Sequence, residues 1–528
     1  YQYRDILKVN QKLFRILSLF GMSKMKRVLD KLHTPIWLFI LLVLVLVLRI
    51  PSFFEPYSYG DEMIYLTLGE AIRRGIPLYS GIHDNKPPLL YVLAAIAGSL
   101  FWFKAILTIW TLCTIFVFWK LASFLFPKKE SFQKVATTIF AVLTTLPLLE
   151  GNIVNAELFM IGPTMLAFYL LLTRRLDFKN LFFSGILFST ASLFKIPAAF
   201  DIPAILFVWI FSTKKFDKSG IVKILRNTFF LSLGFLLPIL ATFIWYFLRG
   251  AASEYLTAAY LQNFGYLSSF RPGDIQKPFL IKNAPLIQRS LVLIFGLLIL
   301  FWKRKRLSKE FSFSVAWLLF SLFAVTLSER PYPHYLIQSV PPLSILLGIL
   351  FTQKNIEQVL VIIPLTLTLF VPVYYKFWYY KTTPYYLRFI NFTLGKIDKK
   401  EYLSSFSKEA QENYEVANFV VSVTMKDEKI FVWGSDSPVI YALSRRLPIG
   451  KYVAEYHIKD FSTQEDTAKQ IASDMPGVVV VLPNSSAFPM LNIFLRKNYG
   501  LVKTIGSTQI WRLLGPKLRD IDDLDFVK

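Results

Sequence analysis

Long apolar runs alternate with short polar loops over the first 375 residues of the chain, and a more polar stretch follows. A hydrocarbon core roughly 30 Å thick is crossed by about 20 apolar helical residues, so each run is a candidate to cross, or nearly cross, a membrane. The pattern predicts about eleven transmembrane helices. They lie near 35–54, 104–126, 134–149, 157–173, 181–195, 197–213, 228–248, 290–302, 311–327, 335–353 and 358–375.

The apolar segment 88–103 is either a short span or a helix lying on the membrane surface. Loop charge separates the two readings, because cytosolic loops carry the excess of Lys and Arg. With 88–103 on the surface, one set of alternating segments is much richer in Lys and Arg than the other: 1–34, 127–134, 174–180, 214–227, 303–310 and 351–357. We therefore predict a juxtamembrane helix within a first external loop, 55–103, and a cytosolic amphipathic segment at 1–34.

Residues 376–528 read differently from the transmembrane region, 35–375, because helix-like and strand-like patterns alternate there. The expected elements are helices at 414–423 and 438–445, strands at 429–433 and 478–482, and a hairpin at 501–513. This alternation predicts a small α/β domain. Because the number of spans is odd, the domain falls on the external side. The predicted fold class is an α-helical polytopic membrane protein with an external C-terminal α/β domain.

The composition supports a membrane protein and argues against several other classes. Of the 528 residues, 54% are hydrophobic and only 18% are charged, which is unusual for a soluble protein of this size. The net charge of +24 fits cytosolic loops and contact with lipid headgroups rather than nucleic acid, since no base-reading motif is present. A single cysteine, Cys113, excludes internal disulfides and a cysteine-based zinc site. No Walker loop, His-Glu-x-x-His or Gly-x-Ser-x-Gly motif indicates nucleotide hydrolysis or zinc proteolysis.

The first external loop contains an acidic pair, Asp61-Glu62, set in apolar sequence. A carboxylate in apolar surroundings with a cation nearby suits general-base work. Adjacent residues on a helix face different directions, so we favour Asp61 for this role and expect Glu62 to support substrate binding. Lys86 precedes two prolines that start the next helix, where a lysine either binds phosphate or snorkels to the interface. The neighbouring pair His83-Asp84 reads as a satisfied surface pair.

Further ionic residues border the later external loops. Glu157 starts an apolar run, and an acid so close to hydrocarbon is functional by default. Lys195 lies between two apolar runs and is either a structural snorkel or a contact to lipid phosphate. The loop Arg330 to Tyr335 combines an arginine, His334 and aromatic rings, a set that suits a phosphate or pyrophosphate group.

Four stretches, in order, resemble the C-type (GT-C) integral-membrane glycosyltransferases, specifically the bacterial relatives of protein O-mannosyltransferases and lipid A aminoarabinose transferases. The stretches are Asp61-Glu62 through Lys86-Pro87-Pro88-Leu89, Asn155-Ala156-Glu157, Phe194-Lys195-Ile196-Pro197, and Arg330 through Tyr335 followed by Pro341-Pro342. The resemblance implies a polyprenyl-phosphate sugar donor and an inverting transfer on the external face of the cell membrane. It implies that Asp61 is the catalytic base and that Glu157 is a second acidic catalytic residue.

The resemblance also assigns positions to the basic residues of the site. Lys86 and Arg330 match basic positions near the donor phosphate, and His334 is a further contact. Together with Glu62, Lys195 and Tyr335 they form the expected substrate-binding set. A divalent metal ion is a candidate cofactor whose ligands are unknown. The expected partners are the polyprenyl-phosphate sugar, a lipid, glycan or protein acceptor, and membrane lipids, but no nucleic acid.

Two other functions stay open from the sequence. A flippase or transporter of lipid-linked sugars would share the many spans and the basic charge, but it would need charged or broken helices at mid-membrane. A non-catalytic subunit of glycan assembly would share the external domain. No motif in the sequence specifies the sugar or the acceptor.

Overall fold

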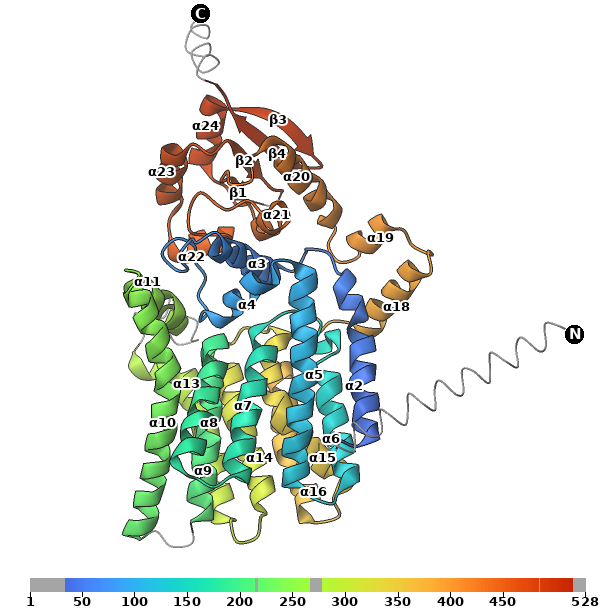
Figure 1. Cartoon of the computed structure of the whole chain (residues 1–528), viewed down its shortest axis with the longest axis vertical. Helices are drawn as coiled ribbons and strands as arrows, with labels where there is room; N and C mark the ends of the chain where they lie inside the picture. The colour runs from blue at the N-terminus through green and yellow to red at the C-terminus, as the bar shows by residue number, and fades with distance from the viewer. Residues whose placement is uncertain (1–33, 214–216, 266–277, 484, 516–528) are drawn as a thin grey trace, which may run out of the picture.

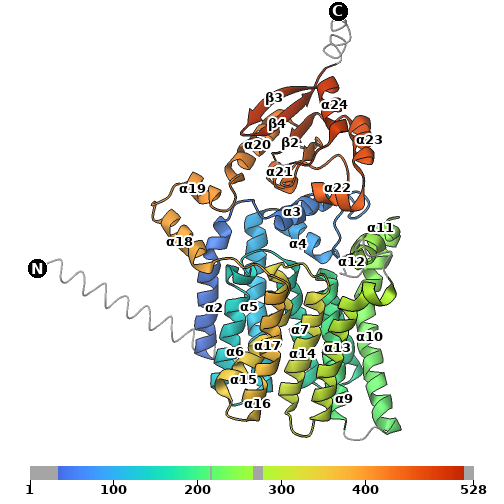
Figure 2. The same ribbon diagram turned by 180° about the vertical axis from the view of Figure 1, so that it is seen from behind.

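The molecule has two parts stacked along its long axis, a bundle of helices and a smaller α/β part (Figures 1 and 2). The computed structural model describes residues 34–213, 217–265, 278–483 and 485–515. The predicted amphipathic segment at 1–34 lies almost wholly outside the described residues. In both views α3 (Gly60–Arg73) and α4 (Leu89–Ala97) lie between the two parts, at one end of the bundle.

Every apolar run predicted to span coincides with helix in the bundle. The main helices are α2 (Ile36–Arg49), α5 (Leu100–Leu125), α6 (Glu130–Leu143), α7 (Ala156–Thr173), α8 (Phe178–Phe194), α9 (Ile202–Ser212), α10 (Lys218–Phe247), α13 (Phe279–Trp302), α14 (Lys309–Thr326), α15 (Val340–Thr352) and α17 (Ile362–Tyr374). Shorter turns join them: η1 (Ile50–Phe54), η2 (Pro147–Leu149), η3 (Ile196–Asp201), α11 (Ala252–Leu256), η4 (Thr257–Leu261), α12 (Gln262–Gly265), η7 (Pro333–Ser339) and α16 (Ile356–Leu360).

These helices confirm the predicted membrane-protein class. Within the described residues, eight helices are long and apolar enough to cross a membrane, and two shorter apolar helices accompany them at Phe178–Phe194 and Ile196–Ser212. The count of about eleven spans stays a prediction. The segment 88–103 does not form a long helix: α4 has nine residues and ends at Gly98, whose φ of 66° suits a glycine cap.

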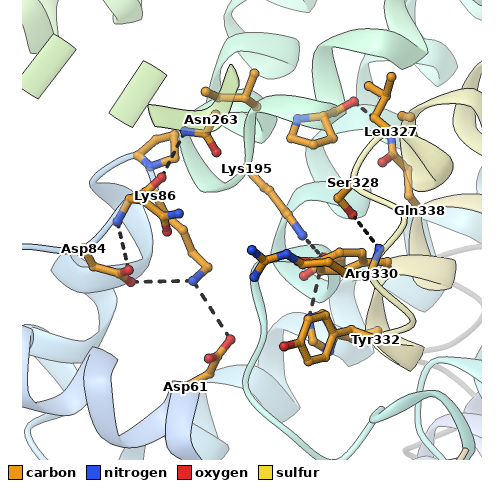
Figure 3. A pocket seen from close by; sticks show the side chains of 18 of the residues that line it. Asp61, Asp84, Lys86, Lys195, Asn263, Leu327, Ser328, Arg330, Tyr332 and Gln338 are labelled. Carbon is orange, nitrogen blue, oxygen red and sulfur yellow. Dashed lines mark hydrogen bonds and ion pairs between the residues drawn. The ribbon is translucent and has the colours of Figure 1, made fainter. Parts of the chain in front are cut away.

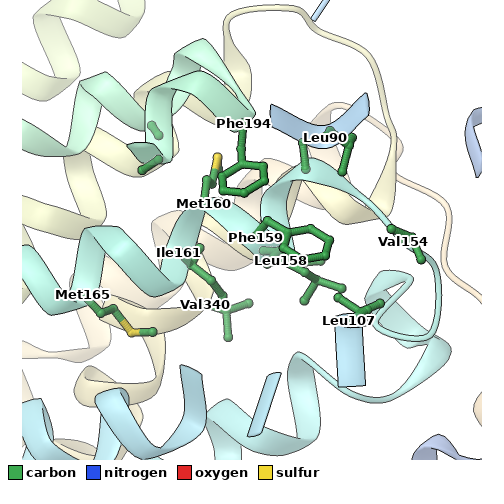
Figure 4. Close-up of a cluster of buried hydrophobic side chains, with 14 of the residues drawn as sticks. Leu90, Leu107, Val154, Leu158, Phe159, Met160, Ile161, Met165, Phe194 and Val340 are labelled. Atoms are coloured by element: carbon green, nitrogen blue, oxygen red, sulfur yellow. The ribbon is translucent and has the colours of Figure 1, made fainter. Parts of the chain in front are cut away.

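Helix α7 lies inside the bundle, where α5, α8 and η7 pack against it. Figure 4 shows Phe159, Met160 and Met165 of α7 among Leu107, Phe194 and Val340 from neighbouring elements. On the outer face, α8 and α10 approach closely at two glycines. A Cβ on Gly234 would lie 2.0 Å from the Phe182 carbonyl oxygen, so only glycine permits this contact. Small residues at helix contacts are the usual means of tight packing in membranes.

The α/β part follows α17. Its helices are α18 (Thr382–Thr393), α19 (Lys399–Ser404), α20 (Ala410–Val423), α21 (Ser437–Ser444), α22 (Glu455–Phe461), α23 (Gln464–Asp474) and α24 (Pro489–Asn498). Its strands are β1 (Phe431–Trp433), β2 (Val478–Val481), β3 (Tyr499–Ile505) and β4 (Thr508–Leu513), in the spatial order β1-β2-β4-β3. The pair β1–β2 is parallel, with Phe431 opposite Val479, and the other pairs are antiparallel. The predicted α/β composition is therefore present. Among its helices α18 lies beside α2 at the end of the bundle, and α22 lies over the α3–α4 region (Figures 1 and 2).

Candidate active site

A cavity of about 650 Å³ lies where the bundle, the α3–α4 region and α22 meet. Its walls come from segments that are far apart in the sequence. Polar residues among those lining it are Tyr59, Asp61, Tyr65, Asp84, Asn85, Lys86, Glu157, Lys195, Asn263, Ser328, Arg330, His334, Tyr335, Gln338, Tyr456, His457 and Asp460. Figure 3 shows Asp61 and Lys86 facing Lys195 and Arg330 across the open space. Seven of the eight predicted site residues thus share one cavity.

Asp61 and Lys86 face each other on one wall. Asp61 lies in the first turn of α3, and its Oδ2 accepts a hydrogen bond of 2.9 Å from the Tyr65 hydroxyl one helical turn later. The Lys86 Nζ lies 4.0 Å from the same oxygen and 5.1 Å from the centre of the Tyr65 ring. Because the Asp61 side chain is 35% exposed, its carboxylate is within reach of a molecule that enters the cavity.

Asp84 forms a second ion pair with Lys86, on a buried carboxylate. Its Oδ2 lies 3.5 Å from the Lys86 Nζ and accepts a 2.7 Å hydrogen bond from the Tyr91 hydroxyl, and Oδ1 accepts from the Asn85 N–H. Burial alone would raise the pKa of Asp84, but the Lys86 charge and these hydrogen bonds lower it to about 2. The expectation of a surface pair at His83-Asp84 is wrong, since both side chains are buried.

A second acidic group lies at the start of α7. The Glu157 carboxylate pairs with the Lys195 ammonium, which also lies 3.6 Å from the centre of the Tyr335 ring. Asn155 caps this helix by accepting from the Leu158 N–H. The position of Lys195 between α8 and η3 directs its side chain into the cavity, as Figure 3 shows.

His334 connects two carboxylates. Its Nδ1 pairs with Glu150, and its Nε2 lies 4.0 Å from the Glu157 Oε1. The Tyr59 hydroxyl donates to the other Glu150 oxygen at 2.9 Å. The first turn of η7 thus places His334 and Tyr335 on the cavity wall beside Arg330, whose guanidinium points into the open space (Figure 3).

Glu62 lies outside this site, which corrects its assignment to the substrate-binding set. Its side chain is 1% exposed and lies 2.7 Å from the Lys104 Nζ, and it accepts a hydrogen bond of 2.6 Å from the Val154 N–H. Burial raises the pKa of Glu62 above its usual value, although the Lys104 charge opposes the shift. The physical reason is helical geometry, because successive side chains on α3 point about 100° apart.

The sequence missed the contribution of the α/β part. Tyr456, His457 and Asp460 on α22 line the cavity, and so does Asn263 on α12. None of them belongs to a motif, and α22 lies far from Lys86 in the chain, so no local signal identifies them. Among the described residues, no group of three or more His, Cys, Asp or Glu side chains is placed to hold a metal ion. The divalent cation therefore remains an expectation from the sequence.

Solved structures share this architecture. The crystal structure of ArnT from Cupriavidus metallidurans bound to undecaprenyl phosphate is similar at a TM-score of 0.55 and 12% identity, over 91% of this chain and 98% of that chain. The apo state of the same protein gives a TM-score of 0.51 at 13% identity, over 90% and 97%. A weaker likeness, with a TM-score of 0.42 and 11% identity over 84% and 69%, is to the oligosaccharyltransferase AglB from Archaeoglobus fulgidus. Neither a scan of protein-family models nor a search of curated proteins finds a match. At such low identity the two ArnT structures establish the fold, which is the GT-C fold.

Proposed function

We propose that this GT-C-fold chain is a glycosyltransferase that moves a sugar from a polyprenyl-phosphate donor to an acceptor at the external face of the membrane. The observation that carries the proposal is the cavity itself. Two carboxylates, Asp61 and Glu157, and three cations, Lys86, Lys195 and Arg330, come from separate segments and line one space of about 650 Å³. Ionic groups that converge on a single cavity from separate segments are typical of catalytic sites.

The three cations suit the phosphate of the donor. Lysine binds phosphate as a point charge, and arginine offers a planar fork that can donate two hydrogen bonds. The ArnT structure of the same fold was solved with undecaprenyl phosphate bound, which supports a lipid phosphate as the leaving group here. Lys86 and Arg330 would stabilise the negative charge that develops on the bridging oxygen as the donor bond breaks.

Asp61 is the group best placed to act as general base. The acceptor heteroatom forms a bond to the anomeric carbon, the bond from that carbon to the phosphate oxygen breaks, and the acceptor proton passes to Asp61. The electron pair of the broken bond leaves with the polyprenyl phosphate. One displacement of this kind inverts the anomeric centre and needs no covalent sugar–enzyme intermediate. Glu157, held by Lys195, is proposed to orient the acceptor.

The two parts of the chain take different places in this proposal. Residues 35–375 form the catalytic membrane domain, and residues 376–528 form an external domain. Loop charge supports this orientation in the cell membrane, because the polar segments at the opposite end of the bundle carry the excess of Lys and Arg. The clustering of ionic residues at one end of the helices favours surface chemistry over transport, which needs ionic groups along the path at mid-membrane.

A transfer assay in detergent tests this function, because no membrane remains across which to transport a lipid. Purified protein is incubated with a panel of labelled polyprenyl-phosphate sugars and with lipid, glycan and peptide acceptors. We expect transfer from at least one donor and a loss of roughly 10²–10⁴-fold in the variant Asp61→Asn. Asp427→Asn, which changes a side chain that is 89% exposed, is the matched control and should keep full activity. Absence of transfer by the unaltered protein, or undiminished turnover by Asp61→Asn, would overturn the proposal.

A further inference from the structure

The α/β part reaches the candidate site through α22. His457 on this helix is buried, and its Nε2 lies 3.5 Å from the Asp84 Oδ1. The other oxygen of the same carboxylate lies 3.5 Å from the Lys86 Nζ. Asp84 is therefore held between a histidine of the α/β part and the lysine proposed to bind the donor phosphate.

The protonation state of His457 suits a hydrogen bond from its imidazole to Asp84. Burial lowers the pKa of His457, although the Asp84 charge opposes the shift, so the imidazole is favoured in its neutral form. Within the described residues its Nδ1 has no hydrogen-bond partner. A neutral ring with the proton on Nε2 presents its donor to Asp84, which accepts hydrogen bonds and has none to give when ionised.

The backbone around Asp84 is fastened to the α/β part as well. The His83 N–H donates to the Lys451 carbonyl oxygen at 2.7 Å, and His83 forms an isolated parallel bridge with Tyr452. The His83 ring packs against Tyr452 and Phe461, with ring centres 5.3 and 5.1 Å apart. The α/β part thus contacts the segment that carries Lys86 in two ways. One set of contacts, at His83, fixes the backbone of the segment. The other, from His457, reaches the Asp84 carboxylate that lies beside the Lys86 ammonium.

We propose that His457 is a positioning residue through which the α/β part orients Lys86, by fixing the carboxylate of Asp84. This inference rests on the proposed function, because it assigns to Lys86 the role of holding the donor phosphate. The α/β part is then a component of the donor site as well as an appended external domain. Removal of the imidazole would leave Asp84 without one of its partners and widen the range of positions open to the Lys86 ammonium.

The test measures binding of labelled undecaprenyl phosphate, together with KM and kcat for the donor that the transfer assay identifies. We expect His457→Ala to weaken binding and to raise the donor KM roughly tenfold, a coupling typical of residues in direct contact. His457→Gln, whose amide can still donate to Asp84, should restore most of the binding. Ile458→Val, which trims a buried side chain on the same helix, controls for disturbed packing and should bind as the unaltered protein does.

A double-variant cycle separates positioning from a general structural role. If His457 acts through Lys86, then His457→Ala should cause no further loss of binding in a Lys86→Ala protein. Additive losses, or binding by His457→Ala within twofold of the unaltered protein, would overturn the inference and leave the proposed function intact. Failure of the unaltered protein to bind undecaprenyl phosphate would instead remove the proposed function, and the inference with it.

Discussion

Two clusters of ionic side chains lie side by side at the end of the bundle, and adjacent residues of α3 belong to different clusters. In the closed cluster, the Lys104 Nζ lies 2.8 Å from Glu55 and 2.7 Å from Glu62, and none of the three side chains is more than 4% exposed. In the open cluster, Asp61 and Lys86 are 4.0 Å apart and their side chains are 35% and 22% exposed. Both clusters pair a lysine with carboxylates, but the distances and the access to solvent differ.

The difference separates structural from functional charge. The three donors of the Lys104 ammonium are taken by two carboxylates and by the Asn152 carbonyl oxygen at 2.8 Å. A group whose hydrogen-bonding capacity is filled inside the protein has nothing to offer a substrate. The looser contact between Asp61 and Lys86 leaves both groups facing a cavity, where their charges can act on a bound molecule.

The largest expected effect comes from opening the closed cluster. Lys104→Met would leave Glu55 and Glu62 as buried carboxylates without a cation, and removal of one partner from a buried ion pair costs about 3–5 kcal/mol. We expect the free energy of unfolding, measured by denaturant titration in detergent, to fall by that amount. A loss below about 1 kcal/mol would show that water reaches the cluster and that the comparison is wrong.

Much of this arrangement could be predicted from the sequence. The apolar runs locate the helices because only helices of that length satisfy their backbone in hydrocarbon. Asp61, Lys86, Glu157, Lys195 and Arg330 stand out because ionic groups beside hydrocarbon are costly unless they are used or paired. Knowing which loops share a side then brings these residues to one end of the bundle.

Other features depend on tertiary contacts that leave no local signal. Glu62 joins the closed cluster only because Lys104 and the Val154 N–H lie on its side of α3. From the sequence alone Asp84 is predicted to be a surface residue, because nothing indicates that the α/β part covers it. His457 lies on α22, far from Asp84 in the chain. The sequence also does not reveal that the Glu150–His334 pair fixes the imidazole beside Glu157.

Replacing the lysine of the open cluster should weaken donor binding more than it lowers stability. Lys86→Met removes one cation from the cavity, and a charge-assisted hydrogen bond contributes about 1.5–3 kcal/mol, so donor binding should weaken by roughly 10–100-fold. We expect the unfolding free energy to fall by no more than about 2 kcal/mol, less than for Lys104→Met, because the Lys86 side chain is 22% exposed and Asp84 keeps the Tyr91 hydrogen bond. Direct titration with labelled undecaprenyl phosphate checks the first value. A stability loss as large as that of Lys104→Met would remove the distinction between the clusters.

Asp84 is buried like the closed cluster but pairs with Lys86 of the open cluster. Its carboxylate should make the stability of the protein depend on pH. Its pKa is lowered from 3.8 to about 2 in the folded chain. A lowered pKa contributes stability that is present above about pH 4 and is lost as the pH falls toward 2, amounting to roughly 2 kcal/mol. The unfolding free energy should therefore drop more between pH 5 and pH 2.5 in the unaltered protein than in Asp84→Asn. Asp427→Asn should retain the full drop, and an equal drop in Asp84→Asn would show that this carboxylate is not the group that titrates.

The smallest effect on the unfolding free energy is expected for a lysine–glutamate pair that is exposed to solvent. Lys134 and Glu130 on α6 are 2.8 Å apart, closer than Asp61 and Lys86, but their side chains are 49% and 65% exposed. An exposed pair one helical turn apart contributes about 0.3–0.5 kcal/mol, because water and salt screen the charges and two flexible side chains must be ordered. Lys134→Ala should change the unfolding free energy by no more than this and should leave undecaprenyl phosphate binding unaltered. A larger loss would mean that distance alone governs the strength of these pairs. A loss within that range would confirm that burial, and not the distance between the charges, makes the Lys104 pairs contribute more to stability than the pairs of Lys86 and Lys134.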